Sequence, residues 1–399
     1  MTRAPIYMDN HATTRVDPRV LETMLPYFDR EYGNAASRTH VFGWRAEEAV
    51  TRARIQVARV LGADPKEILF TSGATESNNL AILGAFASRR EGADHVVTAA
   101  TEHNAVLDPV ESLRARGARV TILGVDGTGR VDPDALRRAI TDRTLLVSLM
   151  FANNEVGTIH PIAEIGRICK ERGVLFHCDA AQAVGKIPVD VQAAGVDLLS
   201  ISAHKVYGPK GVGALYVRRR SPRVLLDPVL HGGGHERGLR PGTINVPGVV
   251  GLGAALEIAA HGMADESRQL AGLRDRLQRG IQARLPDVRL NGHPAERLPH
   301  NLNLSFAHVE GEALLMALDD VAVSSGSACT SARKEPSHVL RAMGLPDEVA
   351  VTSIRFGLGR FNTREEVDAV IERVAGAVAR LRALSPFAES ARDGAQVAT

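Results

Sequence analysis

Short apolar runs alternate with helix-like segments between residues 45 and 220. Seven such runs occur, at 68–71, 95–98, 119–123, 145–150, 174–178, 198–202 and 213–217. Short, mainly apolar runs of this kind are typical of strands that are buried on both faces of a parallel sheet. Helix-start signals lie between them, such as Asp132-Pro133 before 134–140 and Pro161 before 162–172. The pattern predicts an α/β fold with a mostly parallel seven-stranded sheet and helices on both faces.

Longer helical patterns follow Pro247 and indicate a second, smaller α+β domain. Two helices are expected at 248–260 and 266–285, then strands at 288–290 and 301–305 and helices at 310–318 and 365–384. A chain of 399 residues also exceeds the size at which one core keeps growing. We therefore expect a large domain at 15–255 and a small domain made of 1–14 and 256–399.

Composition excludes several classes of protein. The 48 basic and 46 acidic residues are spread along the chain and give a net charge of +2, so we expect neither nucleic acid nor a membrane as a direct partner. No signal-like N-terminus or spanning apolar stretch is recognisable, which favours a cytoplasmic protein. The three cysteines show no CxxC spacing, so no intrinsic metal site and no disulfide framework are expected.

A candidate site for an aldehyde cofactor surrounds Lys205. This lysine follows a buried run and the residues Ser202, Ala203 and His204, and it lies 26 positions after Asp179, which ends another apolar run. A lysine amine can hold pyridoxal phosphate (PLP) as a Schiff base, and an anion beside the pyridine nitrogen keeps it protonated. Only six lysines compete for this role, and the main competitor, Lys210, is expected to face solvent in a Gly-Pro-Lys-Gly turn. Asp179 as a simple helix cap is the alternative reading.

A phosphate site is expected where the run 68–71 enters Ser72-Gly73-Ala74-Thr75 and a helix begins. Free backbone N–H groups and the positive end of a helix dipole suit a phosphate, so Gly73, Ala74 and Thr75 are the predicted contacts. Ser202 and His204 would support the same group. An ordinary capped turn is the alternative.

Three further side chains suit contact with a cofactor ring. His103 follows the run 95–98 and can shuttle protons near neutral pH. Asn154 and Gln182 can hydrogen-bond a phenolic oxygen. A structural histidine and a turn-forming Asn pair are the simpler readings of His103 and Asn154.

A candidate nucleophile, Cys329, lies in the run Ser-Ser-Gly-Ser-Ala-Cys-Thr-Ser at 324–331. The run has small side chains and no acidic residue, so nothing in it opposes ionisation of the thiol. We expect a cysteine that travels between the cofactor and the surface.

These motifs resemble the cysteine desulfurases of the IscS/NifS type, which are PLP enzymes of the class V aminotransferase fold (fold type I). The resemblance runs from Ile6 to about Pro386 and is carried by motifs at 8–14, 71–78, 101–103, 153–155, 177–182, 202–205, 231–238, 324–331 and 353–356. Asn10 and His11 depart from the residues common in the family, and Ala203 stands where Gly is frequent.

The resemblance implies a role for each matching residue. Lys205 would bind the PLP aldehyde, Asp179 would pair with the ring nitrogen, and His103 would stack and move protons. Asn154 and Gln182 would contact the ring oxygen, and Arg355 and Asn154 the substrate. The phosphate would be held by the remaining cofactor-binding positions, Ala74, Thr75, Ser202 and His204, together with Thr243 of a second subunit, which implies a homodimer.

The implied reaction removes sulfur from L-cysteine, gives L-alanine and leaves a persulfide on Cys329. The acceptors would be proteins such as an iron–sulfur scaffold, with tRNA thiolation as a further route and with transient ligation of a cluster by Cys329. A selenocysteine lyase, another class V aminotransferase, a non-enzymatic sulfur carrier and a desulfurase serving nitrogenase or DNA phosphorothioation are the alternatives.

Overall fold

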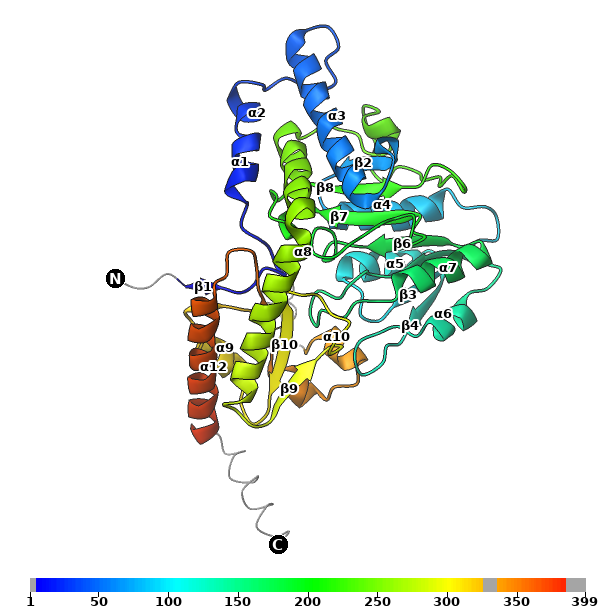
Figure 1. Cartoon of the computed structure of the whole chain (residues 1–399). Helices are drawn as coiled ribbons and strands as arrows, with labels where there is room; N and C mark the ends of the chain where they lie inside the picture. Colours follow the sequence, from blue (N-terminus) through cyan, green and yellow to red (C-terminus); the bar gives the residue numbers. More distant parts are fainter. Residues whose placement is uncertain (1–4, 326–335, 385–399) are drawn as a thin grey trace.

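A seven-stranded sheet forms the centre of the larger part of the molecule (Figure 1). The computed structural model describes residues 5–325 and 336–384 of the chain. The strand order is β2-β8-β7-β6-β5-β3-β4, and β8 runs antiparallel to both of its neighbours while the other six strands share one direction. The bounds are β2 Ile68–Thr71, β3 His95–Ala99, β4 Arg119–Leu123, β5 Thr144–Ser148, β6 Leu175–Asp179, β7 Leu198–Ser202 and β8 Gly213–Val217. The predicted α/β fold with a mostly parallel seven-stranded sheet is confirmed.

Helices cover both faces of this sheet, as predicted. On one face, α3 (Val41–Leu61), α6 (Pro133–Ala139) and α7 (Ile162–Arg172) contribute to one large hydrophobic cluster. On the other face, α4 (Ala74–Ala87) and α5 (Asn104–Ala115) form a second cluster with the opposite sides of the strands. Because every strand except β4 is almost fully buried, the strands read as continuous apolar runs in the sequence.

The helix α8 (Val246–Gln282) is continuous, so the prediction of two helices at 248–260 and 266–285 is wrong. The stretch at 261–265, His-Gly-Met-Ala-Asp, contains no proline and does not interrupt the backbone hydrogen bonds. Residues up to Ala259 pack in the core of the large sheet, whereas Leu270, Leu277 and Ile281 pack in a separate core. By length and composition α8 could cross a membrane, but 56% of its most apolar window is buried inside the protein, as in a core helix.

The second core surrounds a three-stranded antiparallel sheet of order β12-β10-β9. Its strands are β9 Val288–Asn291, β10 Asn301–Phe306 and β12 Ser353–Gly357, and its helices are α9 Gly311–Met316 and α12 Arg364–Leu384. The short helices α10 His338–Ala342 and α11 Asp347–Ala350 form a separate small cluster with Val156. The N-terminal strand β1 (Ile6–Tyr7) pairs with β11 (Val321–Ala322) beside this sheet, and Ile6 and Met8 join the second core. Two short helices, α1 (Pro18–Met24) and α2 (Pro26–Asp29), then lead back to α3. The division at residue 255 stays a prediction.

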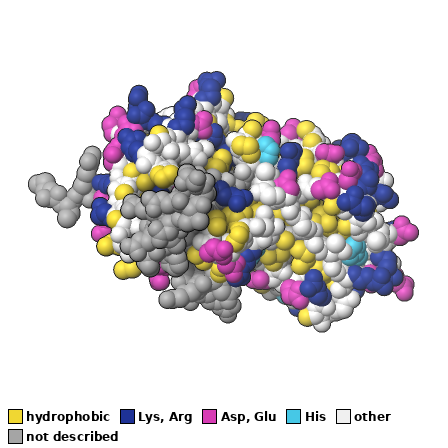
Figure 2. All heavy atoms as spheres, turned by 90° about the horizontal axis from the view of Figure 1, so that it is seen from below, with side chains coloured by type: hydrophobic (Ala, Val, Ile, Leu, Met, Phe, Trp, Pro, Cys, Tyr) yellow, Lys and Arg dark blue, Asp and Glu magenta, His cyan; other side chains and the backbone are white. Residues whose placement is uncertain are grey.

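Charged side chains of both signs interleave on the face shown in Figure 2. Two ion pairs of 2.5 Å join the C-terminal region of α8 to α12: Arg276 of α8 pairs with Asp368, and Arg284, just after α8, pairs with Glu372. The near-equal numbers of basic and acidic residues in the chain therefore appear as a mixture of both charges on this face.

Candidate active site

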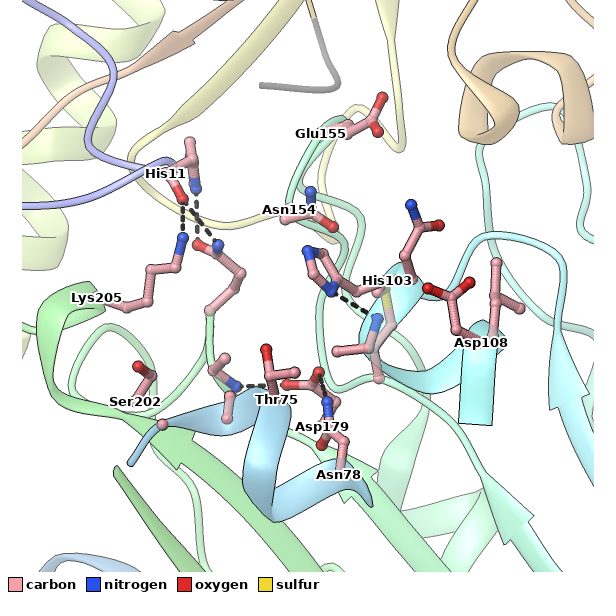
Figure 3. Close-up of a pocket in the computed structure, with 18 of the residues that line it drawn as sticks. His11, Thr75, Asn78, His103, Asp108, Asn154, Glu155, Asp179, Ser202 and Lys205 are labelled. Atoms are coloured by element: carbon pink, nitrogen blue, oxygen red, sulfur yellow. Dashed lines mark hydrogen bonds between the residues drawn. The ribbon is translucent and has the colours of Figure 1, made fainter. Parts of the chain in front are cut away.

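One cavity of about 1080 Å³ opens where the six co-directional strands end. Carboxyl ends of parallel strands are where ligands collect in such sheets. Figure 3 shows side chains from several of these strand ends pointing into the cavity. The predicted site residues that line it are Ala74, Thr75, His103, Asn154, Asp179, Gln182, Ser202, His204, Lys205 and Arg355.

The start of α4 provides the predicted phosphate cradle. The N-cap of α4 is Gly73, which has no side chain that could accept a hydrogen bond from the first N–H groups of the helix. A Cβ placed on Gly73 would meet only Ser202 Oγ, at 3.8 Å, and the backbone φ of 154° also favours glycine. An anion can therefore approach the backbone closely between α4 and Ser202.

Asp179 ends β6 and is only 7% exposed. Asn78 Nδ2 donates to its Oδ2 at 2.7 Å, and Ala181 N donates to its Oδ1 at 3.0 Å. The chain continues as a turn after β6, so Asp179 does not cap a helix. Asn78 was absent from the predicted site, although it lies one helical turn after Thr75 and hence on the same side of α4.

Lys205 belongs to a short 3₁₀ helix, η2 (Ala203–Lys205), directly after β7. Its Nζ donates to the carbonyl oxygens of His11 and Ala12, at 2.5 and 2.7 Å. Lys210 also borders the cavity, but it is exposed, whereas Lys205 is half-buried. This difference favours Lys205 as the amine that a bound cofactor would meet.

His204 lies beside this lysine and contacts Thr13 Oγ1 through Nδ1 at 3.1 Å. Burial, with Lys205 and Lys210 nearby, lowers the pKa of His204 to about 4. The ring is therefore neutral at physiological pH and suits a hydrogen-bonding role better than proton transfer.

His103 is the N-cap of α5, and its Nδ1 accepts a hydrogen bond from Ala105 N at 3.0 Å. Nε2 is then the ring atom that can carry a proton within the cavity. The preceding residue, Glu102, is fully buried, and burial raises the pKa of its carboxyl well above the usual range. Glu102 Oε1 accepts from Met150 N at 2.7 Å and so ties the segment carrying His103 to the end of β5.

Arg355 reaches the cavity from β12 of the second sheet and is 2% exposed. Its Nη2 donates to Asp9 Oδ1 at 2.8 Å, and its Nη1 donates to Asn154 O at 3.1 Å. The guanidinium is thereby oriented before any ligand arrives. Asp9 is a further contributor that the sequence analysis did not assign a role.

Gln182 makes two hydrogen bonds to one residue, His11. Gln182 Oε1 lies 2.9 Å from His11 Nδ1, and Gln182 Nε2 donates to His11 O at 3.1 Å. His11 was noted in the sequence only as a departure from the family pattern.

Among the described residues, one predicted position is not brought into this cavity. Thr243 is exposed and does not line it within one chain. Cys329 lies outside the described residues. The other two cysteines, Cys169 and Cys178, are buried, and burial raises the pKa of both thiols, so neither is suited to act as a thiolate.

Comparison with known proteins shows what the chain as a whole is similar to. The family described as aminotransferase class-V matches residues 6–370. A cysteine desulfurase IscS of Anaeromyxobacter sp. is 59% identical over 98% of this chain and 97% of its own length, and the human cysteine desulfurase is 56% identical over 98% and 85%. A solved NifS-like protein superposes with a TM-score of 0.88 at 39% identity, over 94% of this chain and all of that chain.

Proposed function

Because this chain belongs to the class V aminotransferase family and is a PLP-dependent cysteine desulfurase of the IscS/NifS type, we propose that the cavity described above is where L-cysteine gives up its sulfur to Cys329. The single observation that carries this assignment is the convergence of Lys205, Asp179, His103 and Arg355 on one cavity. These are an amine, a carboxylate, an imidazole and a guanidinium, which are the groups that PLP chemistry on an amino acid needs.

The residues present fit PLP. The uncapped start of α4 with Ser202 suits the phosphate, and the buried Asp179 suits a protonated ring nitrogen. When bound, PLP would supply an aldehyde for the substrate amine and an electron sink for the bonds next to it. Lys205 would hold the aldehyde when no substrate is present.

The side chains of this protein would then act in sequence on L-cysteine. Arg355 binds the carboxylate, because a guanidinium offers paired donors to two oxygens. His103 moves a proton at Nε2, and the amine of Lys205 is the second group that can do so. The Cβ–S bond of cysteine breaks as an S–S bond to Cys329 forms, and protonation of the carbon gives L-alanine.

The decisive experiment is incubation of the holoenzyme with L-cysteine and a reductant, with alanine and sulfide measured together. We expect equal amounts of both products. Transfer of the amine to a keto acid without sulfide would instead indicate an aminotransferase, and turnover of selenocysteine alone would indicate a lyase. Loss of both products in Lys205→Ala would link the reaction to this site.

We propose that an iron–sulfur scaffold protein is the acceptor and that the enzyme acts in the cytoplasm. The proposal is supported by the resemblance to the IscS/NifS type and by the absence of a cysteine framework of the secreted kind. Cluster formation on a purified scaffold, with L-cysteine and ferrous iron, tests it. Efficient sulfur transfer to a tRNA-thiolation protein but not to the scaffold would redirect the assignment.

We also propose a homodimer in which each subunit completes the site of the other. Large exposed apolar side chains gather on α1, α2, the segment that follows and the first turn of α3, namely Leu21, Leu25, Phe28, Tyr32 and Trp44, each between 47% and 64% exposed. Such a concentration is typical of an interaction surface. Phe28→Glu with Trp44→Glu should give monomers in sedimentation velocity, whereas Met316→Glu, which changes a 75% exposed side chain on α9, should leave the dimer intact.

A complementation experiment tests the contribution of Thr243 to the other subunit. Lys205→Ala removes the amine, and Thr243→Glu would repel the phosphate from an exposed position. If Thr243 acts across the dimer, refolding the two variants together restores about one quarter of the wild-type sites, because half of the dimers are mixed and each mixed dimer holds one intact site. If Thr243 acts within its own chain, no mixture regains activity.

A further inference from the structure

The Gln182 amide is connected to the second sheet by a chain of hydrogen bonds that passes through His11. The residues of this chain, here called the His11 relay, are Arg297, Asn301, His11 and Gln182. All four are at most 9% exposed. The donor and acceptor character of each group fixes the orientation of the next one.

The relay begins with the orientation of the Asn301 side chain. Arg297 Nη2 donates to Asn301 Oδ1 at 3.1 Å, and a guanidinium can only donate. On the other side, Asn301 Nδ2 donates to the carbonyl oxygen of Glu155 at 3.1 Å, which can only accept. Both contacts require the same orientation of the amide, so the second N–H of Asn301 points to His11 Nε2, 3.1 Å away.

His11 must therefore accept at Nε2 and carry its proton on Nδ1. The ring is 1% exposed and stacks on His300 with the ring centroids 4.4 Å apart. Burial, with Arg355 and Lys205 nearby, lowers the pKa of His11 to about 3, so the ring holds a single proton at neutral pH. His11 Nδ1 then donates to Gln182 Oε1 at 2.9 Å.

Gln182 is the end of the relay. With Oε1 facing the ring, Nε2 donates to His11 O at 3.1 Å, and the same carbonyl oxygen accepts from Lys205 Nζ. One N–H of Gln182 is still available to a ligand in the cavity that Gln182 lines. The relay thus makes Gln182 a donor to that ligand and prevents the amide from turning its oxygen inward.

We propose that His11 is a positioning residue, locked as its Nδ1–H tautomer by Asn301, which holds Gln182 so that its N–H points to the ring oxygen of bound PLP. The inference rests on the proposed contact between Gln182 and that oxygen. It explains how a residue of β10 in the second sheet sets a hydrogen bond in the cofactor site of the first.

The first test needs no cofactor. Proton–nitrogen correlation spectra of the apoprotein with ¹⁵N-labelled histidine should contain one buried ring protonated on Nδ1 and accepting on Nε2, and this signal should vanish in His11→Phe. Assignment of His11 to the Nε2–H tautomer or to the cationic form at neutral pH would overturn the inference.

The second test measures the visible absorption maximum of bound PLP and its dissociation constant. In Gln182→Leu we expect a shifted maximum and about tenfold weaker binding, because one hydrogen bond to a charged group is lost. His11→Phe should reproduce both changes, and the double variant should add little to either. His11→Asn, whose amide can donate in the place of Nδ1 but offers Asn301 no acceptor in the place of Nε2, should fall between His11→Phe and the wild type.

The matched control is His300→Phe, which alters the stacked neighbour of His11 without touching the relay and should leave the maximum and the affinity unchanged. If the absorption maximum and the affinity change in Gln182→Leu but not in His11→Phe, the role of His11 is overturned and the contact of Gln182 with the cofactor stands. An unchanged spectrum and affinity in Gln182→Leu would overturn the contact of Gln182 with the cofactor, on which the inference depends.

Discussion

Asp179→Asn should separate catalysis from stability in this protein. The substitution removes one negative charge and keeps the shape of the side chain. Asp179 Oδ1 accepts from Ala181 N, and an amide oxygen can accept the same hydrogen bond. Loss of the partner of the ring nitrogen should lower kcat by about 10²–10³-fold, the range found when one preorganised electrostatic contact is deleted.

The stability of this variant follows from the neighbour of Asp179. Asn78 donates to Asp179 Oδ2 through Nδ2, and its own Oδ1 is buried without a hydrogen-bond partner. In Asp179→Asn the Asn78 amide can turn over and accept from the new NH₂ group. A neutral hydrogen bond then replaces a charge-assisted one, so the free energy of unfolding should fall by only about 1 kcal/mol.

The matched control is Asp197→Asn at the opposite end of the sheet. Asp197 is 8% exposed, accepts from Phe176 N at 2.9 Å and pairs with Arg218 at 3.0 Å. Loss of this ion pair should cost about 2 kcal/mol and leave kcat unchanged, because the residue lies away from the cavity. Alanine formation and urea unfolding of both variants are the assays. Near wild-type turnover of Asp179→Asn would refute the assignment of Asp179 to the cofactor.

Three further outcomes are expected. Lys205→Ala should lose turnover and the borohydride-reducible link to PLP, and a link that persists would move the assignment to Lys210. Cys329→Ser should keep PLP and its spectral response to L-cysteine but lose sulfide release, and mass spectrometry of the wild type should find one added sulfur on the Cys329 peptide; full sulfide release by the variant would overturn the mechanism. Burial lowers the pKa of His177 to about 4, from a usual value near 6.5. The neutral, buried ring therefore contributes its full stability above about pH 6.5, and this contribution is lost as the pH falls from 6.5 toward 4. The unfolding free energy of apo His177→Gln should therefore depend less on pH in this window than that of the wild type, and an unchanged slope would show that His177 is not buried in its neutral form.

The sheet was predictable because every strand except β4 is almost fully buried, so these strands appear as apolar runs with no need for periodicity. The continuous α8 could not be predicted, because its two halves pack in different cores and their apolar patterns are separated by the stretch 261–265, which belongs to neither core. The strand β1 has two residues, too few to form a pattern, and its partner β11 lies more than 300 positions later.

The same distinction holds for the site. Groups that follow strands, such as Lys205 and Asp179, could be predicted because parallel strands end at one edge of the sheet. His11 and Asn301 could not, since 290 positions separate them and nothing near either one indicates the contact.

The pairing of β1 with β11 also bears on how the chain folds as it leaves the ribosome. Ile6 and Met8 emerge before the large sheet, yet their partners in β11 and β12 emerge after it, near the end of the described residues. At about 5–20 residues per second, the seven strands of the large sheet are synthesised about 7–27 s before β12 begins. During this interval β1 has no partner strand, and the cavity at the edge of the large sheet still lacks Arg355.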